Sequence, residues 1–289
     1  MAAQPPDQSP GPSQATSRAP SQAPSQAPSQ GGAQLHVRLV QRASSLDPAE
    51  NLAVLEDVAA LPGDTDLVVL PEAFARDFGA PGSDLAPFAE SLDGPFAEQL
   101  RRLSGTTGTA WLAGMFEVAP DPARPLNTLV LAADEQLTAY RKIHLYDSFG
   151  YKESDTISPG RLQPAAAEVR GFPIGLMTCY DLRFPELART LVEQGAEALV
   201  VPAAWVAGER KVEHWRTLLR ARAIENTVWV VGVGQPGPRY TGHSVVVAPD
   251  GDVLVEADDA DDVVLDAVLD RAAVADVRRT NPSLANRRM

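Results

Sequence analysis

Hydrophobic positions recur along the chain with two different spacings, and the two spacings alternate. Short apolar runs typical of strands are followed by segments in which apolar residues recur every three or four positions, as they do in helices. In the first half, strand-like runs cover residues 35–41, 66–70, 110–118, 126–133 and 136–142. Helices are predicted over residues 48–61 and 94–103, the first with Asp47 as N-cap and Pro48 at the first helical position.

The second half of the chain repeats this order. Strands are predicted at residues 174–178, 198–202 and 227–233, and helices at 184–194 and 209–226. Residues 243–257 are predicted to form a hairpin that turns at Asp250-Gly251, and a last strand is expected near 262–269. Strands that alternate with helices predict an α/β protein whose helices cover the faces of its sheets.

Residues 1–33 differ in composition from the rest of the chain. They hold seven of the 25 prolines, and Ala-Pro-Ser-Gln occurs three times in tandem between residues 19 and 30. Such a segment buries too little apolar surface to offset the entropy lost on ordering. We therefore predict a disordered tail rich in Pro, Ser, Gln and Ala over residues 1–33, and one folded domain over residues 34–289. A proline-rich ligand for a partner domain is the alternative role of the tail.

Composition and charge narrow the classes of function. The 289 residues carry a formal charge of −13, and the pI is about 4.7, which argues against nucleic acid as a partner because phosphates would be repelled. A single cysteine excludes a disulfide framework. No stretch approaches the roughly 18 apolar residues that span a bilayer, so no membrane partner is expected. Because the N-terminus also lacks the apolar segment of a secretory signal, we predict a cytoplasmic protein.

Three reactive side chains stand where predicted strands end. Glu72 follows the run at 66–70, Lys142 ends the run at 136–142, and Cys179 follows the run at 174–178. Ligand sites of open α/β sheets lie at the carboxyl ends of strands. Each residue also has a purely structural interpretation: a solvated loop glutamate, an exposed lysine at a strand end and an inert core thiol.

Cys179 could act as a nucleophile if its proton is removed. It lies at a predicted strand-to-helix turn, where backbone N–H groups and a helix N-terminus favour the thiolate. The chain has four histidines, His36, His144, His214 and His243. None belongs to a local Cys–His signature, although His144 follows Lys142 by two residues. Glu72 could instead accept the proton, and Lys142 could stabilise the oxyanion formed when the thiolate attacks a carbonyl or nitrile carbon.

The sequence around these three residues resembles one known family. Residues 69–74 are Val-Leu-Pro-Glu-Ala-Phe, residues 140–147 are Tyr-Arg-Lys-Ile-His-Leu-Tyr-Asp, and residues 178–186 are Thr-Cys-Tyr-Asp-Leu-Arg-Phe-Pro-Glu. In this order they resemble the nitrilase superfamily, the carbon–nitrogen hydrolases. Further similar segments surround Asn51 and lie at 202–205, 220–226 and 242–244, so the resemblance covers roughly residues 35–270.

The resemblance implies a fold and a set of roles. The fold is a four-layer α-β-β-α sandwich, with no metal and no organic cofactor. Glu72 would be the general base, Lys142 would stabilise the tetrahedral intermediate, and Cys179 would form a thioester acyl-enzyme. The backbone N–H of Tyr180 would complete the oxyanion hole, and Glu153 would be a second glutamate that takes part in catalysis or positions the substrate.

The same segments look most like the Nit-type amidase branch, which implies a substrate class. Members of that branch hydrolyse small carboxylate-bearing amides such as deaminated glutathione or the ω-amides of 2-oxo acids, and we expect release of ammonia. Arg183 and Trp205 are candidate substrate contacts, because an arginine fork can bind a carboxylate with two hydrogen bonds. An ion pair of Arg183 with Glu186 or Asp181 is the alternative.

Other functions stay open at this point. The same three side chains would serve an N-carbamoyl amide hydrolase or a nitrilase, and a non-catalytic scaffold or binding protein is the alternative outside enzymes. The helix at 209–226 is predicted to gather apolar residues on one face: Val212, Trp215, Leu218, Leu219 and Ile224. This face could pack in the core or form a subunit interface, and the resemblance implies a homodimer or a higher homo-oligomer.

Overall fold

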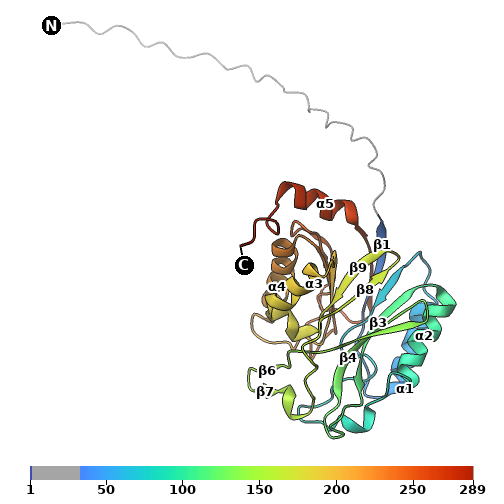
Figure 1. The fold of residues 1–289 in the computed structure, drawn as a ribbon. Coiled ribbons are helices and arrows are strands. Elements are labelled where there is room, and N and C mark those ends of the chain that lie inside the picture. The colour runs from blue at the N-terminus through green and yellow to red at the C-terminus, as the bar shows by residue number, and fades with distance from the viewer. Residues whose placement is uncertain (2–32, 289) are drawn as a thin grey trace. The chain divides into compact units, whose positions relative to one another are not determined.

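The computed structural model describes Met1 and residues 33–288. The fold contains two six-stranded sheets (Figure 1). Apart from Met1 and Ala33, the predicted tail at 1–33 lies outside the described residues. The first sheet has the order β14-β1-β2-β3-β4-β5. Its strands are β1 (Gln34–Gln41), β2 (Leu67–Val69), β3 (Ala110–Glu117), β4 (Leu126–Ala133), β5 (Gln136–Arg141) and β14 (Val263–Asp270).

The second sheet has the order β13-β12-β11-β10-β9-β8. Its strands are β8 (Ala165–Val169), β9 (Phe172–Leu176), β10 (Ala198–Ala203), β11 (Trp229–Gly234), β12 (Val245–Val247) and β13 (Val253–Glu256). The helices are α1 (Pro48–Ala59), α2 (Pro95–Thr107), α3 (Pro185–Glu193), α4 (Lys211–Asn226) and α5 (Arg271–Thr280). A two-stranded hairpin of β6 (Asp147–Ser148) and β7 (Tyr151–Lys152) stands apart from both sheets.

The two halves of the chain follow the same plan, as their sequence patterns predicted. Strands β1, β2 and β3 run parallel and are linked by α1 and α2, and strands β9, β10 and β11 run parallel and are linked by α3 and α4. Each parallel set then continues into antiparallel strands, β4 and β5 in one sheet and β12 and β13 in the other. Strand β14 comes from the end of the chain but joins the first sheet, antiparallel to β1.

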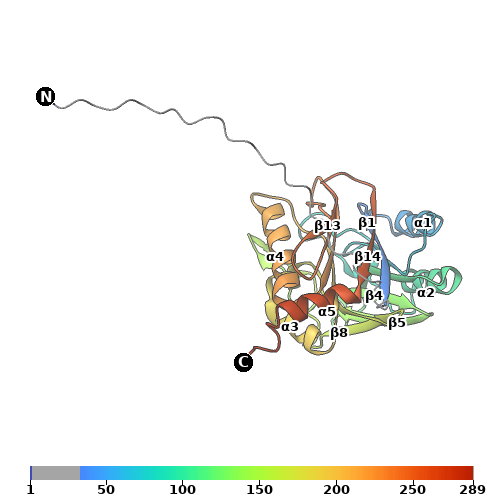
Figure 2. The ribbon, with the colours of Figure 1, turned by 90° about the horizontal axis from the view of Figure 1, so that it is seen from above.

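Alternating side chains explain the four layers. In β2, Leu67 and Val69 belong to the core shared with the second sheet, whereas Val68, and Leu70 directly after the strand, pack with residues of α1 and α2. Such strands are buried on both faces, so they read as nearly continuous apolar runs. Helices α1 and α2 cover one outer face and α3 and α4 the other (Figures 1 and 2), which confirms the predicted α-β-β-α sandwich.

Local signals predicted most of these elements. Asp47 caps α1 by accepting a hydrogen bond from the backbone of Ala49, and the predicted hairpin at 243–257 is β12 and β13. The pattern gave no prediction for β8, α5 or the β6–β7 hairpin. Within residues 33–288, none of the helices combines the length and the apolar character needed to cross a bilayer.

The predicted face of α4 is wrong in one residue. Trp215 and Leu219 are buried as expected, but Ile224 is 45% exposed. At about 100° per residue, Ile224 falls almost opposite the Trp215–Leu219 stripe. It lies instead against Gly251 of the hairpin turn, and the buried stripe is completed by Lys211, Arg222, Ala223 and Asn226.

Candidate active site

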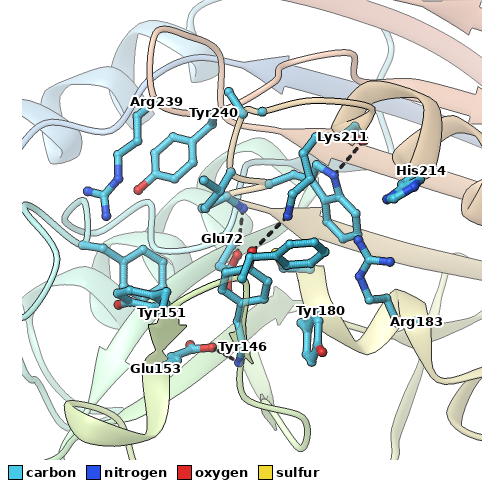
Figure 3. Close-up of a pocket in the computed structure, with 18 of the residues that line it drawn as sticks. Glu72, Tyr146, Tyr151, Glu153, Tyr180, Arg183, Lys211, His214, Arg239 and Tyr240 are labelled. Carbon is cyan, nitrogen blue, oxygen red and sulfur yellow. Dashed lines mark hydrogen bonds between the residues drawn. The ribbon is translucent and has the colours of Figure 1, made fainter.

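A cavity of about 640 Å³ opens where carboxyl ends of strands from both sheets meet (Figure 3). Glu72 follows β2 and Lys142 follows β5, both in the first sheet, whereas Cys179 follows β9 in the second. The structure brings all seven predicted site residues to this cavity: Glu72, Lys142, Glu153, Cys179, Tyr180, Arg183 and Trp205. Its volume is in the range of small-molecule sites.

Gln235, Asn51 and Gly114 contact the backbone of the turn that carries Glu72. The side-chain amide of Gln235 donates to the carbonyl of Glu72 (2.8 Å), and the side chain of Asn51 donates to the carbonyl of Ala75 (3.0 Å). Behind the turn, Gly114 of β3 lies so close that a Cβ there would be 2.3 Å from the backbone nitrogen of Ala73. A glycine inside a buried strand is a sequence signal for such a close approach.

Two buried carboxylates share the Lys142 ammonium. Nζ of Lys142 donates to Oε1 of Glu72 (2.9 Å) and to Oε2 of Glu153 (2.8 Å). The side-chain amide of Asn127 donates to both carboxylates, and the backbone N–H of Ala204 donates to Oε2 of Glu72 (2.7 Å). We call Glu72, Asn127, Lys142 and Glu153 the paired cluster. Glu72 and Lys142 are 1% and 2% exposed, which excludes the solvated-loop and exposed-lysine interpretations.

Cys179 begins a single 3-10 turn, Cys179–Arg183, in a left-handed conformation with φ of 47°. The carboxylate of Asp181 accepts hydrogen bonds from the backbone of Thr178 (2.9 Å) and the hydroxyl of Tyr140 (2.6 Å). Its other oxygen lies 2.7 Å from Nδ1 of His144, which is outside the cavity. These contacts fix the turn that presents the thiol.

The titration behaviour of these groups follows from burial and from their neighbours. Burial opposes ionisation of Glu72, but Lys142 and the hydrogen bonds outweigh it and lower the pKa of this carboxyl. Burial also opposes the charge of Lys142, yet the Glu153 and Glu72 carboxylates raise its pKa well above 10.5. Burial, and then the Glu72 carboxylate, raise the pKa of the Cys179 thiol well above 9.0.

The resting state is therefore a thiol beside a carboxylate. The expectation that the turn favours a thiolate is wrong: the helical turn is short, and the thiol is buried beside two carboxylates that share one ammonium. A carboxylate that contacts a thiol in this way can accept its proton when the sulfur attacks an electrophilic carbon.

Four aromatic side chains form one wall of the cavity: Tyr146, Phe149, Tyr180 and Trp205. We call them the aromatic wall. Cζ of Arg183 lies 4.9 Å from the ring centre of Trp205, and the Nε1–H of that indole donates to the carbonyl of Lys211 (3.0 Å). Neither Glu186 nor Asp181 pairs with Arg183, so the predicted ion-pair alternative is wrong; Nε and Nη2 of Arg183 have no partner among the described residues.

Several lining residues carried no prediction. Lys211 and His214 are three positions apart at the start of α4, and both face the cavity (Figure 3). A spacing of three residues places both side chains on the same side of a helix, which could have indicated a shared site. The apolar residues of that helix instead suggested packing in the core or a subunit interface. Arg239 and Tyr240, across the cavity from Arg183 in Figure 3, both hydrogen-bond to Asp77.

Among residues 33–288, no three His, Cys, Asp or Glu side chains gather where they could hold a metal ion.

Comparison with known proteins identifies the family of this chain. Residues 22–279 match the carbon–nitrogen hydrolase family. This chain belongs to the carbon–nitrogen hydrolase family. It is 41% identical over 232 residues to the deaminated glutathione amidase of Escherichia coli O157:H7, across 79% of this chain and 87% of that protein.

Solved structures of carbon–nitrogen hydrolases share the fold. A CN-hydrolase superfamily protein of Xanthomonas campestris superposes with a TM-score of 0.80 at 30% identity, covering 89% of this chain and 98% of the other. Nit3 of Saccharomyces cerevisiae, a member of branch 10 of the nitrilase superfamily, superposes with a TM-score of 0.78 at 28% identity, covering 89% and 97%.

The remaining family-like segments of this hydrolase support the site. Arg222 of segment 220–226 donates to the carbonyl of Leu182 (2.7 Å), which closes the turn after Cys179. The hydroxyl of Ser244, in segment 242–244, accepts a hydrogen bond from the backbone N–H of Gly234 (3.0 Å). That contact fixes Gly234, the last residue of β11. The next residue, Gln235, donates a hydrogen bond to the backbone carbonyl of Glu72.

Proposed function

We propose that this carbon–nitrogen hydrolase cleaves the amide C–N bond of a small carboxylate-bearing amide through a thioester on Cys179. The observation that carries the proposal is that Glu72, hydrogen-bonded to Lys142 at 2.9 Å, and the buried Cys179 thiol line the same cavity. The lowered pKa of Glu72 and the raised pKa of Cys179 favour a carboxylate beside a thiol. Such a pair holds a base and a nucleophile together without needing a histidine.

The first half-reaction forms the acyl-enzyme. Sγ of Cys179 attacks the amide carbon while its proton passes to Glu72, and the carbonyl oxygen becomes an oxyanion. The Lys142 ammonium and the backbone N–H of Tyr180 stabilise that charge. Glu72 then gives its proton to the departing nitrogen as the C–N bond breaks. Glu153 holds the ammonium in place through its 2.8 Å contact.

The second half-reaction releases the acid. A water molecule gives a proton to Glu72 and attacks the thioester carbon, and the collapsing intermediate expels the thiolate. The thiolate takes the proton back from Glu72, and the site returns to its starting state. Splitting one difficult hydrolysis into two steps is the advantage of the covalent route.

The proposed substrate class rests on the similarity to deaminated glutathione amidase and on Arg183. Its guanidinium lines the cavity and pairs with no carboxylate of the described residues, so a substrate carboxylate would supply that partner. A primary amide would release ammonia. Deaminated glutathione would release cysteinylglycine, because its scissile nitrogen belongs to that dipeptide.

A panel of substrates tests the proposal. We expect turnover of deaminated glutathione, 2-oxoglutaramate or succinamate, followed by release of ammonia or of the free amine, and no comparable turnover of N-carbamoyl-β-alanine or simple nitriles. Cys179→Ala should lose nearly all turnover with an unchanged circular dichroism spectrum. Full activity of Cys179→Ala would overturn the mechanism, and turnover of the carbamoyl compound alone would overturn the substrate class.

A further inference from the structure

Two cations lie over rings of the aromatic wall and have no carboxylate partner in the described part of the chain. Lys211 is 8% exposed, and within residues 33–288 its ammonium has one hydrogen-bond partner, the hydroxyl of Tyr146 (2.9 Å). Its ammonium lies 3.9 Å from the ring centre of Phe149 and 5.9 Å from that of Trp205. Arg183 lies over the same two rings, at 5.8 and 4.9 Å.

The surroundings of Lys211 do not favour its positive charge. Burial and then the charge of Arg183 lower the pKa of Lys211, and no carboxylate among residues 33–288 pairs with the ammonium. Ring faces attract both cations, but they do not supply the full negative charge that a buried cation favours. Glu209 also lines the cavity, yet it is exposed and forms no ion pair with either cation among the described residues.

Lysine is also a rare choice in this chain. The sequence contains three lysines and 22 arginines, and two of the three lysines, Lys142 and Lys211, line the cavity. Lys142 is matched by two carboxylates of the protein, whereas Lys211 is matched by none within residues 33–288. A compact ammonium beside a planar guanidinium can hold one carboxylate from two sides.

We infer that Lys211, acting with Arg183, binds the substrate carboxylate and sets the preference for acidic over neutral amides. This inference rests on the proposed function and adds a residue to it. The wall of rings positions both cations, and Tyr146 holds the ammonium toward the cavity (Figure 3). A carboxylate bound there would restore the charge balance that the protein alone does not provide.

Matched substrates measure the preference directly. Succinamate and its methyl ester differ only in the carboxylate, so the ratio of their kcat/KM values reports its recognition. We expect Lys211→Met to lower this ratio roughly 10- to 100-fold, mainly through KM for succinamate. Lys211→Arg should recover most of the ratio. Lys152→Met is the matched control, because Lys152 is exposed and does not line the cavity; its ratio should equal that of the wild type.

A binding measurement separates this inference from the proposed function. Calorimetry with succinate on Cys179→Ala and on Cys179→Ala/Lys211→Met should give a dissociation constant at least tenfold weaker in the double variant. Equal binding by the two proteins, or an unchanged substrate ratio in Lys211→Met, would overturn the role of Lys211 even if amide turnover depends on Cys179. Lysine-dependent binding without amide turnover in the wild type would overturn the proposed function and leave the carboxylate site standing.

Discussion

The paired cluster and the aromatic wall face one cavity but treat charge in opposite ways. In the paired cluster, every charged group has a partner within hydrogen-bond distance, and one ammonium is shared by two carboxylates. In the aromatic wall, Arg183 and Lys211 lie over rings and have no carboxylate partner among residues 33–288.

The difference separates chemistry from recognition. A charge that the protein balances itself keeps its geometry and protonation before a substrate arrives, as preorganised catalysis requires. A buried charge left without a partner gains most when a ligand supplies the partner, which is a source of selectivity. Changes in the paired cluster should therefore alter kcat, and changes at the aromatic wall should alter KM for acidic substrates.

Among changes to the paired cluster and the aromatic wall, the largest effect is expected from Glu72→Gln. Removing the general base should lower turnover roughly 10²- to 10⁴-fold. Because the Glu72 carboxylate raises the pKa of Cys179, its loss should also lower that pKa. The rate of alkylation by iodoacetamide as a function of pH measures the shift. Glu168→Gln, an exposed residue of β8, is the control; wild-type turnover in Glu72→Gln would contradict the assignment.

Gly114→Ala tests whether the backbone behind Glu72 matters for catalysis. The new Cβ would collide with the backbone of Glu72 and Ala73, so the carboxylate must move. A displacement of this kind can lower kcat on the order of 10²-fold. Gly105→Ala in α2 is the matched control, because the atoms nearest to its Cβ belong to the flexible side chain of Glu135. Equal kcat in the two variants would show that the close approach is unimportant.

The two regions should also respond to different ranges of pH. With the neutral methyl ester, activity should fall only below pH 4.5, because the pKa of Glu72 is lowered from that value and the base must be ionised. With succinamate, KM should begin to rise at an alkaline pH that is still below 10.5, because the pKa of Lys211 is lowered from that value and Lys211 loses its charge first. The pKa of Lys142 is raised well above 10.5, so kcat should stay constant over the same range. A simultaneous alkaline loss of kcat and of binding would remove the distinction.

The smallest effect is expected from Tyr146→Phe. This change deletes the hydroxyl that meets the Lys211 ammonium but keeps the ring. Loss of one hydrogen bond corresponds to roughly a 2- to 10-fold rise in KM for succinamate. Steady-state kinetics should show kcat nearly unchanged; a large fall in kcat with constant KM would place Tyr146 in the chemistry instead.

Sequence reasoning reached the elements and the three central residues, but for different reasons. Apolar periodicity located the strands that precede Glu72, Lys142 and Cys179, because buried parallel strands leave a strong signal. It could not show that the two halves stack face to face; that expectation came from the family resemblance. Strand β8, with the sequence Ala-Ala-Ala-Glu-Val, has too weak an apolar signal to be recognised.

The missed site residues share a cause. Asn127 lies inside an apolar strand and Lys211 at the start of a helix, so neither stands out in the pattern. Their importance depends on contacts between segments far apart in the chain, such as the 2.8 Å bond from Asn127 to Glu72. The charge state of Cys179 was mispredicted for the same reason, since burial and then the Glu72 carboxylate raise its pKa, and neither can be read from the local turn.

The central claim is that the buried thiol becomes covalently acylated by the substrate. The most direct measurement is intact-protein mass spectrometry after rapid acid quenching of the enzyme during turnover of succinamate. The account predicts one added succinyl group, located on Cys179 by peptide mapping and missing from Cys179→Ala. Steady turnover with no adduct at any quench time, or an adduct on another residue, would contradict it.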